Sequence, residues 1–260
     1  MVQSGIKGKQ RDHEGGVQVI ARAAEILRSL KGHPEGLSLS QIAREVGLAR
    51  STVHRIVNAL AAEDFVTSAS PNGRVRLGLG LTPLAAWVNS EMRDQLHPYL
   101  ERLSREIDET VDLAVLDGNQ VFFIDQIMVP HRLQAVSGIG LTFPIHCTAN
   151  GKALLAELPI EQTKHLLPEH FEAFTTSTIT TREQLLEELE CIRSERIAFD
   201  REEHTQGICA VGKTLRDPMG NLVAITIPVP AIRFYGNEQK LSSALFHICE
   251  EIQRRFEALL

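Results

Sequence analysis

The sequence has few cysteines, no long apolar run, no internal repeat and no low-complexity tract. Its four cysteines are scattered and form no CxxC pair, which argues against a disulfide framework or a zinc ribbon. No apolar run approaches the roughly 18 residues that a membrane-spanning helix needs. Residues 1–16 are polar and lack the apolar stretch of a signal peptide. We therefore expect a cytoplasmic protein with reduced thiols.

The sequence does contain enough apolar residues for one or two domains, and its charge is uneven. Of the 260 residues, 43% are apolar, and a domain typically takes about 100–200 residues. The net charge is -6, yet residues 17–80 carry eight Lys or Arg against five Asp or Glu, whereas residues 81–260 carry 16 basic and 26 acidic residues. A basic front before an acidic rear indicates a DNA-contacting module attached to a domain that does not touch DNA.

The front of the chain has the pattern of a helix-turn-helix. Apolar residues in 17–30 recur at helical spacing. Ser38 and Gln41 have capping-box spacing, so a second helix begins at Ser38, and Gly47 is placed to end it in left-handed geometry. After a short turn, 49–65 has the pattern of a third helix. A short glycine-containing turn between two helices is typical of the helix-turn-helix motif.

The third predicted helix has one aliphatic face and one polar, basic face. Ser51, Arg55 and Asn58 point away from the aliphatic side, with His54 on the flank. A helix fits the DNA major groove, where such side chains hydrogen-bond to base edges, and its start can hold a phosphate. The alternative interpretation is an ordinary solvent-facing helix. The predicted DNA-contacting residues of this helix are Arg50, Ser51, Thr52, His54, Arg55 and Asn58.

A predicted β-hairpin follows directly and favours DNA binding. Residues 65–67 and 74–77 alternate like strands, and Ser-Pro-Asn-Gly at 70–73 is a strong turn sequence. A hairpin behind a helix-turn-helix is a wing. Arg74 and Arg76 project from the same strand face, as expected for side chains near a phosphate backbone or a minor groove. We therefore predict a winged helix-turn-helix.

The rear of the chain alternates between helix and strand patterns. Residues 82–97 form a predicted linker helix with Thr82 as its N-cap, and Pro98 is expected to break it. Strand pairs with helices between them predict an α+β domain around a mainly antiparallel sheet. The predicted strands are 111–116, 121–127, 133–136, 197–199, 208–215 and 222–227, and the predicted helices are 99–108, 148–158, 181–195 and 239–260.

Three segments of the chain resemble the IclR family of bacterial transcriptional regulators. They are SQIAREVGLARSTVHRIVNAL in the front half, PIHCTANGKALLAEL at 144–158 and AFDREEHTQGICAVGKTLRDPMGNLVAITI at 198–227. The resemblance implies a C-terminal GAF-like effector-binding domain, a dimer formed through the DNA-binding domains and linker helices, and often a dimer-of-dimers tetramer. It implies a repressor or activator whose binding to a palindromic operator responds to a small organic-acid-like effector.

The expected domain organisation follows from the two predicted folds and this resemblance. Residues 1–16 form a flexible tail, and 17–81 form the winged helix-turn-helix. The linker helix is 82–97, and 98–260 form the effector-binding and oligomerisation domain.

The resemblance also implies an effector pocket between the HCTANGK helix, the loop with the aspartate of FDREE and the strands behind it. Free N–H groups at the helix start favour a carboxylate, and Asp200 would accept hydrogen bonds from a ligand hydroxyl. The family often has a cysteine where Ala210 stands, and Pro228 stands where small or hydroxyl residues are common, so aromatic or longer-chain acids are expected. Strand alternation turns Cys209 and Ala210 to opposite faces. The implied pocket residues are Ala149, Asn150, Asp200, Cys209, Ala210, Thr226 and Pro228.

Other chemistry has less support in the sequence. His146 and Cys147 invite a nucleophile interpretation, but a thiol needs a base and an orienting group. Gly151 and Lys152 lack the remaining residues of a P-loop, and the His and Cys residues have no metal-ligand spacing. We expect no enzyme, no cofactor and no metal. Two alternatives stay open: an enzyme with the winged helix as a regulatory appendage, and a winged helix that binds only proteins.

Overall fold

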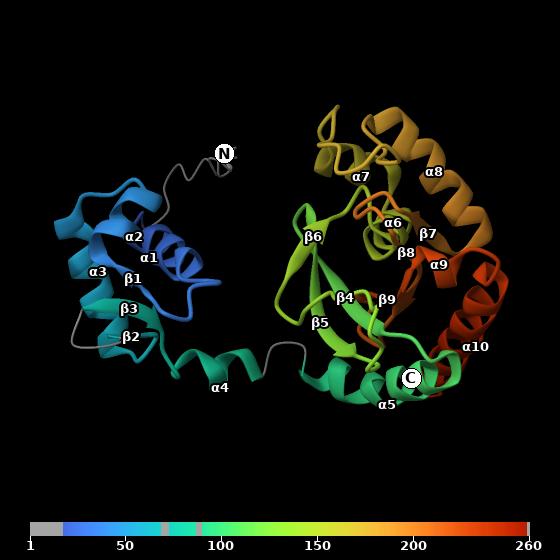
Figure 1. Cartoon of the computed structure of the whole chain (residues 1–260), viewed down its shortest axis with the longest axis horizontal. Helices are drawn as coiled ribbons and strands as arrows, with labels where there is room; N and C mark the ends of the chain where they lie inside the picture. The colour runs from blue at the N-terminus through green and yellow to red at the C-terminus, as the bar shows by residue number, and fades with distance from the viewer. Residues whose placement is uncertain (1–17, 69–72, 87–89, 259–260) are drawn as a thin grey trace. The chain divides into compact units, whose positions relative to one another are not determined.

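The computed structural model describes residues 18–68, 73–86 and 90–258 of the chain. The chain divides into two compact units, the front unit Met1–Val88 and the rear unit Asn89–Leu260 (Figure 1). None of the described helices is long and apolar enough to cross a membrane.

The front unit is a winged helix-turn-helix, as predicted. Its three-stranded antiparallel sheet has the order β1-β3-β2, and β2 with β3 forms the expected hairpin. Residues 70–72 of the predicted turn lie outside the described residues. The elements are α1 (Gln18–Ser29), β1 (Leu37–Ser38), α2 (Leu39–Glu45), α3 (Arg50–Ala62), β2 (Val66–Ser68), β3 (Arg74–Leu77) and α4 (Leu81–Ala86).

The ends of α2 are fixed by the residues that the sequence indicates. The Ser38 hydroxyl accepts a bond from the backbone N–H of Gln41, and the Gln41 side chain accepts one from the backbone N–H of Ser38. At the other end Gly47 has a φ of 67°. This left-handed residue lets the N–H of Leu48 donate to the carbonyl of Ala43 at 3.0 Å, which closes a Schellman motif. The capping box and the glycine stop are therefore confirmed.

The rear unit is built on one six-stranded antiparallel sheet with the order β6-β5-β4-β9-β8-β7. In Figure 1 this sheet is curled, and helices lie on both of its faces. This confirms the predicted α+β class. The strands are β4 (Val111–Asp117), β5 (Gln120–Ile127), β6 (Thr142–Pro144), β7 (Ala198–Arg201), β8 (Ile208–Arg216) and β9 (Leu222–Pro230).

Each face of the sheet is buried by a different pair of helices. One face packs against α5 and α10 through a core that includes Leu100, Val211 and Leu245. The other packs against α6 and α8 through a core that includes Leu154 and Leu189, and we call it the α6 face. The helices are α5 (Ser90–Ile107), α6 (Ala149–Ala156), α7 (Ile160–Leu166), α8 (Arg182–Glu195), α9 (Ala231–Phe234) and α10 (Glu238–Glu257).

The predicted helix break at Pro98 is wrong. Pro98 lies inside α5, which runs from Ser90 to Ile107, and the chain instead divides between residues 88 and 89. A proline inside a helix costs about 3 kcal/mol through the lost hydrogen bond and steric clash. Pro98 is exposed, whereas Leu96, Leu100 and others of this helix are fully buried. Burial of the apolar face therefore outweighs the local cost of the proline.

The predicted strand at 133–136 is also wrong. The third strand of this part of the sheet is β6, which pairs with β5 through 120–122. Residues 133–136 belong to an irregular connection, and Arg233 fixes it by donating to the carbonyl of Leu133 at 3.1 Å. Tertiary hydrogen bonds thus hold this apolar segment without a strand partner.

Candidate DNA-contacting surface and ligand site

The polar face of α3 is exposed and does not pack against the protein core. Val53, Ile56, Val57 and Leu60 of this helix are buried in the core of the front unit. The predicted contact residues on the opposite side are exposed, except Thr52, which is half-buried. The exposed ones are Arg50, Ser51, His54, Arg55 and Asn58.

Three of these side chains lie on adjoining turns of α3. His54 Nε2 and Asn58 Nδ2 are 3.5 Å apart, and Arg55 is the next residue along. Imidazole, guanidinium and amide groups together can donate to and accept from base edges. The start of α3 follows Ala49, which provides no side-chain cap, so its first backbone N–H groups can bind an anion such as a phosphate.

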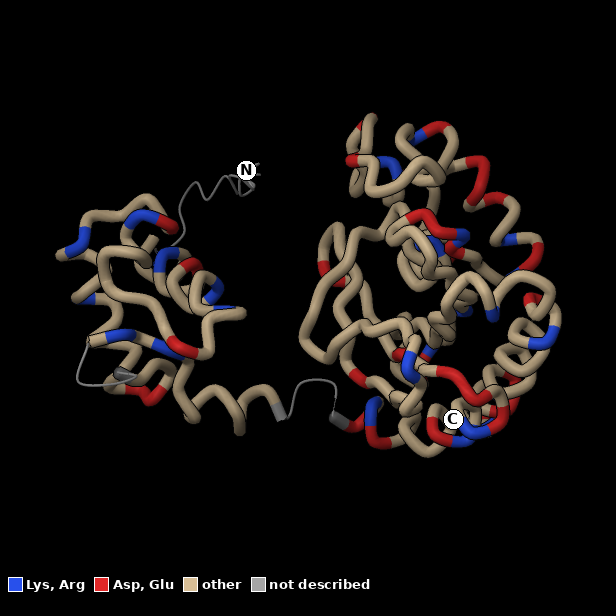
Figure 2. Tube along the Cα trace, viewed as in Figure 1, with Lys and Arg blue, Asp and Glu red and all other residues tan. Residues whose placement is uncertain are grey.

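The wing presents its two arginines to solvent on either side of a buried residue. Arg74 and Arg76 are exposed, whereas Val75 between them is buried. Arg74 pairs in register with Ser38, the N-cap of α2, and its Nη1 donates to the carbonyl of Gly36 at 3.4 Å. In Figure 2 the basic residues of the front unit include positions on α3 and on β3. Arg74 and Arg76 are therefore the side chains of the wing that can contact a phosphate backbone.

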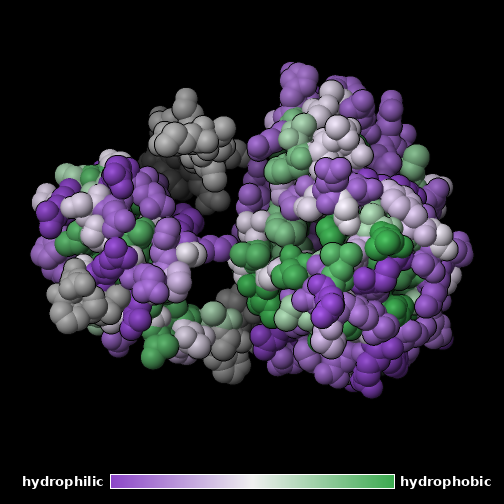
Figure 3. All heavy atoms as spheres, in the orientation of Figure 1, coloured by the Kyte–Doolittle hydropathy of each residue, from purple (hydrophilic) through white to green (hydrophobic). Residues whose placement is uncertain are grey.

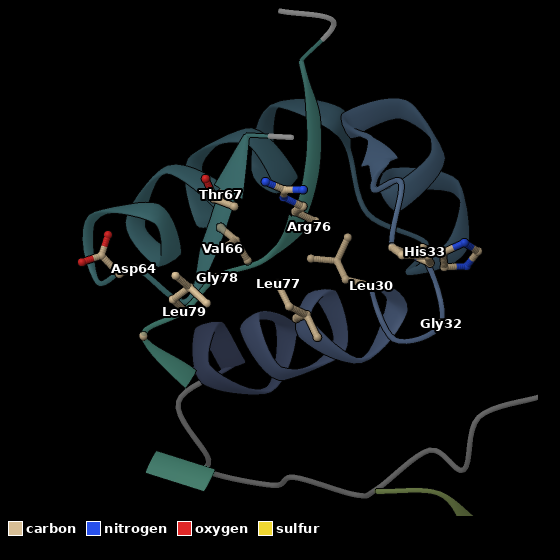
Figure 4. Close-up of a pocket in the computed structure, with 12 residues that line it drawn as sticks. Leu30, Gly32, His33, Asp64, Val66, Thr67, Arg76, Leu77, Gly78 and Leu79 are labelled. Carbon is tan, nitrogen blue, oxygen red and sulfur yellow. The ribbon is translucent and has the colours of Figure 1, made fainter. Parts of the chain in front are cut away.

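A cleft of about 1000 Å³ lies beside the wing of the front unit. Figure 4 shows Leu30, Leu77 and Leu79 around it, with His33 and Arg76 at its margins. Leu77 and Leu79, which are 41% and 87% exposed, both line this cleft and form part of an exposed apolar patch. The front unit therefore has an apolar surface that its own core does not cover.

In the rear unit, most of the pocket residues that the family resemblance implies lie on the α6 face of the sheet. Asp200, Ala210 and Pro228 are direct register neighbours across β7, β8 and β9, so their side chains project from the same face. Thr226 is the register partner of Gly212. A Cβ at Gly212 would lie 2.9 Å from the backbone of Ala149, so the start of α6 lies directly against this part of the sheet.

Cys209 does not belong to this group. It lies on the opposite face of β8, in the core shared with α5 and α10, because successive strand residues alternate between faces. Its inclusion among the pocket residues is therefore wrong. The remaining six, Ala149, Asn150, Asp200, Ala210, Thr226 and Pro228, are all buried.

A buried charge cluster surrounds Asp200 and was not predicted from the sequence. Lys152 of α6 is completely buried, and its Nζ donates to Glu203 at 2.6 Å and to Glu188 at 3.1 Å. The backbone N–H of Glu203 donates to Asp200 Oδ1 at 2.7 Å. Burial, reinforced by the neighbouring Glu203, raises the pKa of Asp200 to about 7. Asp200 thus anchors its own loop, in addition to any role toward a ligand.

A second buried polar cluster lies on β4 of the same face. Asp112 accepts hydrogen bonds from Gln126 Nε2, at 2.8 Å, and from the hydroxyl of Ser137. Desolvation raises its pKa to about 6. Asp112 lies in the run VDLAVL. An acidic residue within an apolar strand sequence is the signal from which a special role could have been predicted.

The histidines considered for nucleophilic or metal chemistry lie in an aromatic cluster. His146 stacks on Phe171 with ring centroids 4.6 Å apart, and His204 stacks on Phe143 at 4.5 Å. Desolvation raises the pKa of the buried Cys147 thiol, which keeps it protonated and a poor nucleophile. In the part of the chain that the structure describes, no three His, Cys, Asp or Glu side chains are placed to hold a metal ion.

A winged helix-turn-helix with a polar recognition helix, joined to an α+β domain, defines a DNA-binding transcriptional regulator. The IclR helix-turn-helix domain matches residues 19–70, and the bacterial transcriptional regulator IclR C-terminal domain matches residues 84–254. The chain belongs to the IclR family. Its matched relatives are named as regulators and not as enzymes.

Similar proteins span almost the whole chain. The HTH-type transcriptional regulator Rv1719 of Mycobacterium tuberculosis is 52% identical over 91% of this chain and 92% of its own length. TtgV of Pseudomonas putida is 39% identical over 92% of each. Among solved structures, IclR of Thermotoga maritima is 29% identical with a TM-score of 0.70, covering 93% of this chain and 99% of its own. An IclR homologue from Microbacterium hydrocarbonoxydans complexed with 4-hydroxybenzoate is 21% identical, with a TM-score of 0.82 and coverages of 92% and 99%.

Proposed function

We propose that the chain binds a palindromic operator as a homodimer and that a small organic effector in the rear unit modulates this binding. The observation that carries the proposal is the exposed polar face of α3, opposite an aliphatic face that the front unit buries. Arg55, Asn58 and His54 contact base edges in the major groove. Arg50, Ser51 and Thr52 lie at the helix start, toward the phosphates. This activity belongs in the cytoplasm, where bacterial DNA lies.

The wing and the linker complete the DNA-binding part of the proposal. Arg74 and Arg76 contact the phosphate backbone or minor groove next to the site read by α3. The proposed domain limits are the winged helix-turn-helix at 17–81 and the effector domain behind the linker, whose boundary we now place between residues 88 and 89.

The proposed effector site lies on the α6 face of the sheet. Its supports are the start of α6 at Ala149 and Asn150, and the side chains of Asp200, Ala210, Thr226 and Pro228 on the facing strands. The first N–H groups of a helix favour an anionic group, so the effector is an organic acid whose carboxylate lies at the start of α6. The relative with a bound 4-hydroxybenzoate is a precedent for such a ligand in this fold.

Exposed apolar surfaces support self-association of the chain. In the front unit Val19, Ile20, Leu79 and Leu84 are all at least half exposed. We propose that they and the linker helix form the dimer interface. Figure 3 shows apolar side chains gathered in a second area, on the visible face of the rear unit. In the rear unit, Met128, Leu133, Val136 and Ile139 are more than half exposed. We propose that this second area pairs dimers into a tetramer.

The test is selection of bound sequences from a pool of random DNA duplexes by the purified full-length chain. A dimeric regulator enriches a palindrome, with half-sites one helical turn or a multiple of it apart. Enrichment of no sequence, with binding to a protein from the same cell, would instead favour a winged helix that recognises only proteins. Turnover of a bound ligand by the purified chain would favour an enzyme.

A further inference from the structure

Four residues line up across the middle of the α6 face, on four neighbouring strands. Gly212 of β8 pairs with Thr226 of β9, Thr226 pairs with Asp112 of β4, and Asp112 pairs with Gln126 of β5. Directly opposed residues project from the same face of a sheet. A Cβ on Gly212 would point at Ala149 of α6, so the row faces α6. The side chains of Thr226 and Asp112, in the same row, therefore face α6 as well.

The polar groups in this row are buried but incompletely satisfied. Thr226 is 3% exposed, and its Oγ1 has no hydrogen-bond partner among the described residues. Asp112 is 1% exposed, and among the described residues it accepts from Gln126 and Ser137 alone, whereas a carboxylate offers about four acceptor sites. A buried polar group that is left unpaired is destabilising. The row therefore has free hydrogen-bonding capacity, and its fixed charge is negative.

A loop closes over Asp112 and supplies one of its partners. Ser137 belongs to the β5–β6 connection, and its hydroxyl donates to Asp112 Oδ2. The same connection carries Gln134, whose Oε1 is buried without a partner in the described part of the chain. Arg233 holds the connection through the carbonyl of Leu133 and pairs with Glu109 at the start of β4, with Nη2 to Oε2 at 2.8 Å. The polar end of the site is thus enclosed by protein.

We propose that Asp112 and Thr226 form the specificity-determining end of the effector site and bind a hydroxyl or N–H donor of the ligand. Asp112 accepts the donor's hydrogen, and the Thr226 hydroxyl donates to a ligand hydroxyl oxygen or accepts from a ligand N–H. A second carboxylate at this end would face the Asp112 carboxylate, and a methoxy group has no hydrogen to give. This inference rests on the proposed effector site, and it names the chemical class of the ligand as a hydroxylated or aminated organic acid.

The spacing of the strands sets the size of this ligand. Gly212, under the start of α6, and Asp112 are two strands apart, so their backbones are separated by roughly 10 Å. The carboxylate of the ligand lies at the start of α6 and its donor lies at Asp112. A single ring substituted at opposite ends, or a chain of about six carbons, has a suitable span once the side chains of the site reach inward.

The experiment measures binding of two matched series to the purified full-length chain by isothermal titration calorimetry. One series is 4-hydroxybenzoate, 4-methoxybenzoate and terephthalate, and the other is 6-hydroxyhexanoate, 6-methoxyhexanoate and adipate. In at least one series the hydroxylated acid should bind roughly ten- to a hundred-fold more tightly than its two counterparts. The assignment is overturned if neither hydroxylated acid binds, or if the hydroxyl, methoxy and dicarboxylate forms bind equally.

Variants separate recognition by this row from a structural role. Thr226→Val removes the unpaired hydroxyl without changing the shape, so the ligand-free protein should melt at the same or a higher temperature while its preference for hydroxyl over methoxy disappears. Asp112→Asn should lower affinity for the hydroxylated acid by a similar factor. The control is Asp117→Asn at the exposed end of the same strand, which should change neither. An unchanged preference in Thr226→Val would contradict the proposal.

The same ligands, added to an operator-binding titration, keep this inference apart from the proposed function. If an acid without a donor releases or strengthens DNA binding as well as its hydroxylated counterpart does, the regulator function stands and the role of Asp112 and Thr226 falls. If the hydroxylated acid binds with the expected preference but leaves DNA binding unchanged, the ligand assignment stands and effector control of DNA binding falls.

Discussion

At the scale of single residues, we expect sequence recognition to depend most on Arg55. It lies at the centre of the exposed face of α3, where a guanidinium can make paired hydrogen bonds to a base. We expect Arg55→Ala to weaken binding to the selected operator by about 1–3 kcal/mol and to relax the preference at one base position. A fluorescence anisotropy titration against single-base variants of the operator measures both effects.

The control for Arg55 is Arg254→Ala, which removes an exposed positive charge from α10 of the rear unit. It should leave operator affinity unchanged. If Arg55→Ala retains full affinity and the same base preference, α3 does not enter the major groove through this face.

Lys152 stabilises the rear unit through its buried pairs with Glu203 and Glu188. Removal of one partner leaves a buried charge uncompensated, so Lys152→Ala should lower the free energy of unfolding by about 3–5 kcal/mol. Urea denaturation followed by circular dichroism measures the loss. Lys164→Ala is the matched control, since its pair with Glu161 is exposed and exposed pairs contribute about 0–1 kcal/mol. Equal losses of unfolding free energy in both variants would show that the buried Lys152 pairs stabilise the protein no more than the exposed Lys164 pair does.

Some candidate functional residues could be predicted from the sequence and others could not, and the difference has a physical reason. Arg55 and Asn58 were predicted because a helix repeats every 3.6 residues, so a local pattern separates the outer from the inner face. The contacts of Asp112 and Lys152 involve partners far along the chain, such as Ser137 and Glu203. Contacts between distant segments leave no local periodicity from which they could be predicted.

At the scale of elements, the wing β2–β3 is expected to contribute affinity without sequence preference. Arg74 and Arg76 extend from one face of β3. Arg74→Ala should weaken binding to all duplexes similarly and reduce the slope of log affinity against log salt by about one. Titrations of the operator and a scrambled duplex at several salt concentrations measure this. An effect confined to the operator would mean that Arg74 reads bases instead of phosphates.

Helix α5 packs against the sheet that carries the proposed effector site, and it follows the segment that leads to the front unit. His97 Nδ1 of α5 lies 2.7 Å from Asp125 Oδ2 of β5, and the neighbouring Gln126 bonds to Asp112. We expect His97→Phe to reduce the effect of a ligand on DNA affinity, while ligand binding and effector-free DNA binding persist. The coupling of two sites is typically about 1–3 kcal/mol, so the loss is measurable in operator titrations with and without ligand.

Arg93→Ala, one turn earlier in α5 and exposed, is the control for His97→Phe and should keep the ligand response. If His97→Phe abolishes ligand binding itself, the His97 contact with Asp125 serves the structure of the site and not its coupling to α5.

Tertiary contacts decide the two features that were predicted wrongly, the helix break at Pro98 and the strand at 133–136. The helix pattern of α1, α2, α3 and α10 is strong and local, and these elements appear within a few residues of the expected bounds. Pro98 is tolerated because the buried side of α5 outweighs it, and 133–136 stays irregular because Arg233 and β6 take the available partners. The short helices α7 and α9 were missed because one or two turns show too little periodicity.

At the scale of the whole molecule, two buried acids should make the stability of the rear unit depend on pH. The pKa values of Asp112 and Asp200 are raised by burial to about 6 and about 7, from 3.8. Between pH 4 and 7 the folded state therefore holds more protons than the unfolded state, and these two groups lower the free energy of unfolding as the pH rises. Above about pH 8 both are ionised in either state, and the effect levels off.

His146 and His204 act in the opposite direction, because burial lowers their pKa below 6.5. The folded state binds their protons less tightly, so they add to stability as the pH rises toward 6.5. The pH profile of the native chain is thus a balance, and the informative quantity is its difference from the variant Asp112→Asn with Asp200→Asn. Asparagine keeps one acceptor oxygen in place of two and cannot ionise.

Below pH 4 the native chain and this double variant should differ by an amount that is nearly constant with pH. From pH 4 to about 8 the native chain should lose stability relative to the variant, and beyond about pH 8 the difference should again be constant. Urea denaturation at half-unit steps of pH measures the curve. A difference that does not change across this window would mean that the two carboxyl groups keep ordinary pKa values, and that the α6 face is more hydrated than its buried side chains indicate.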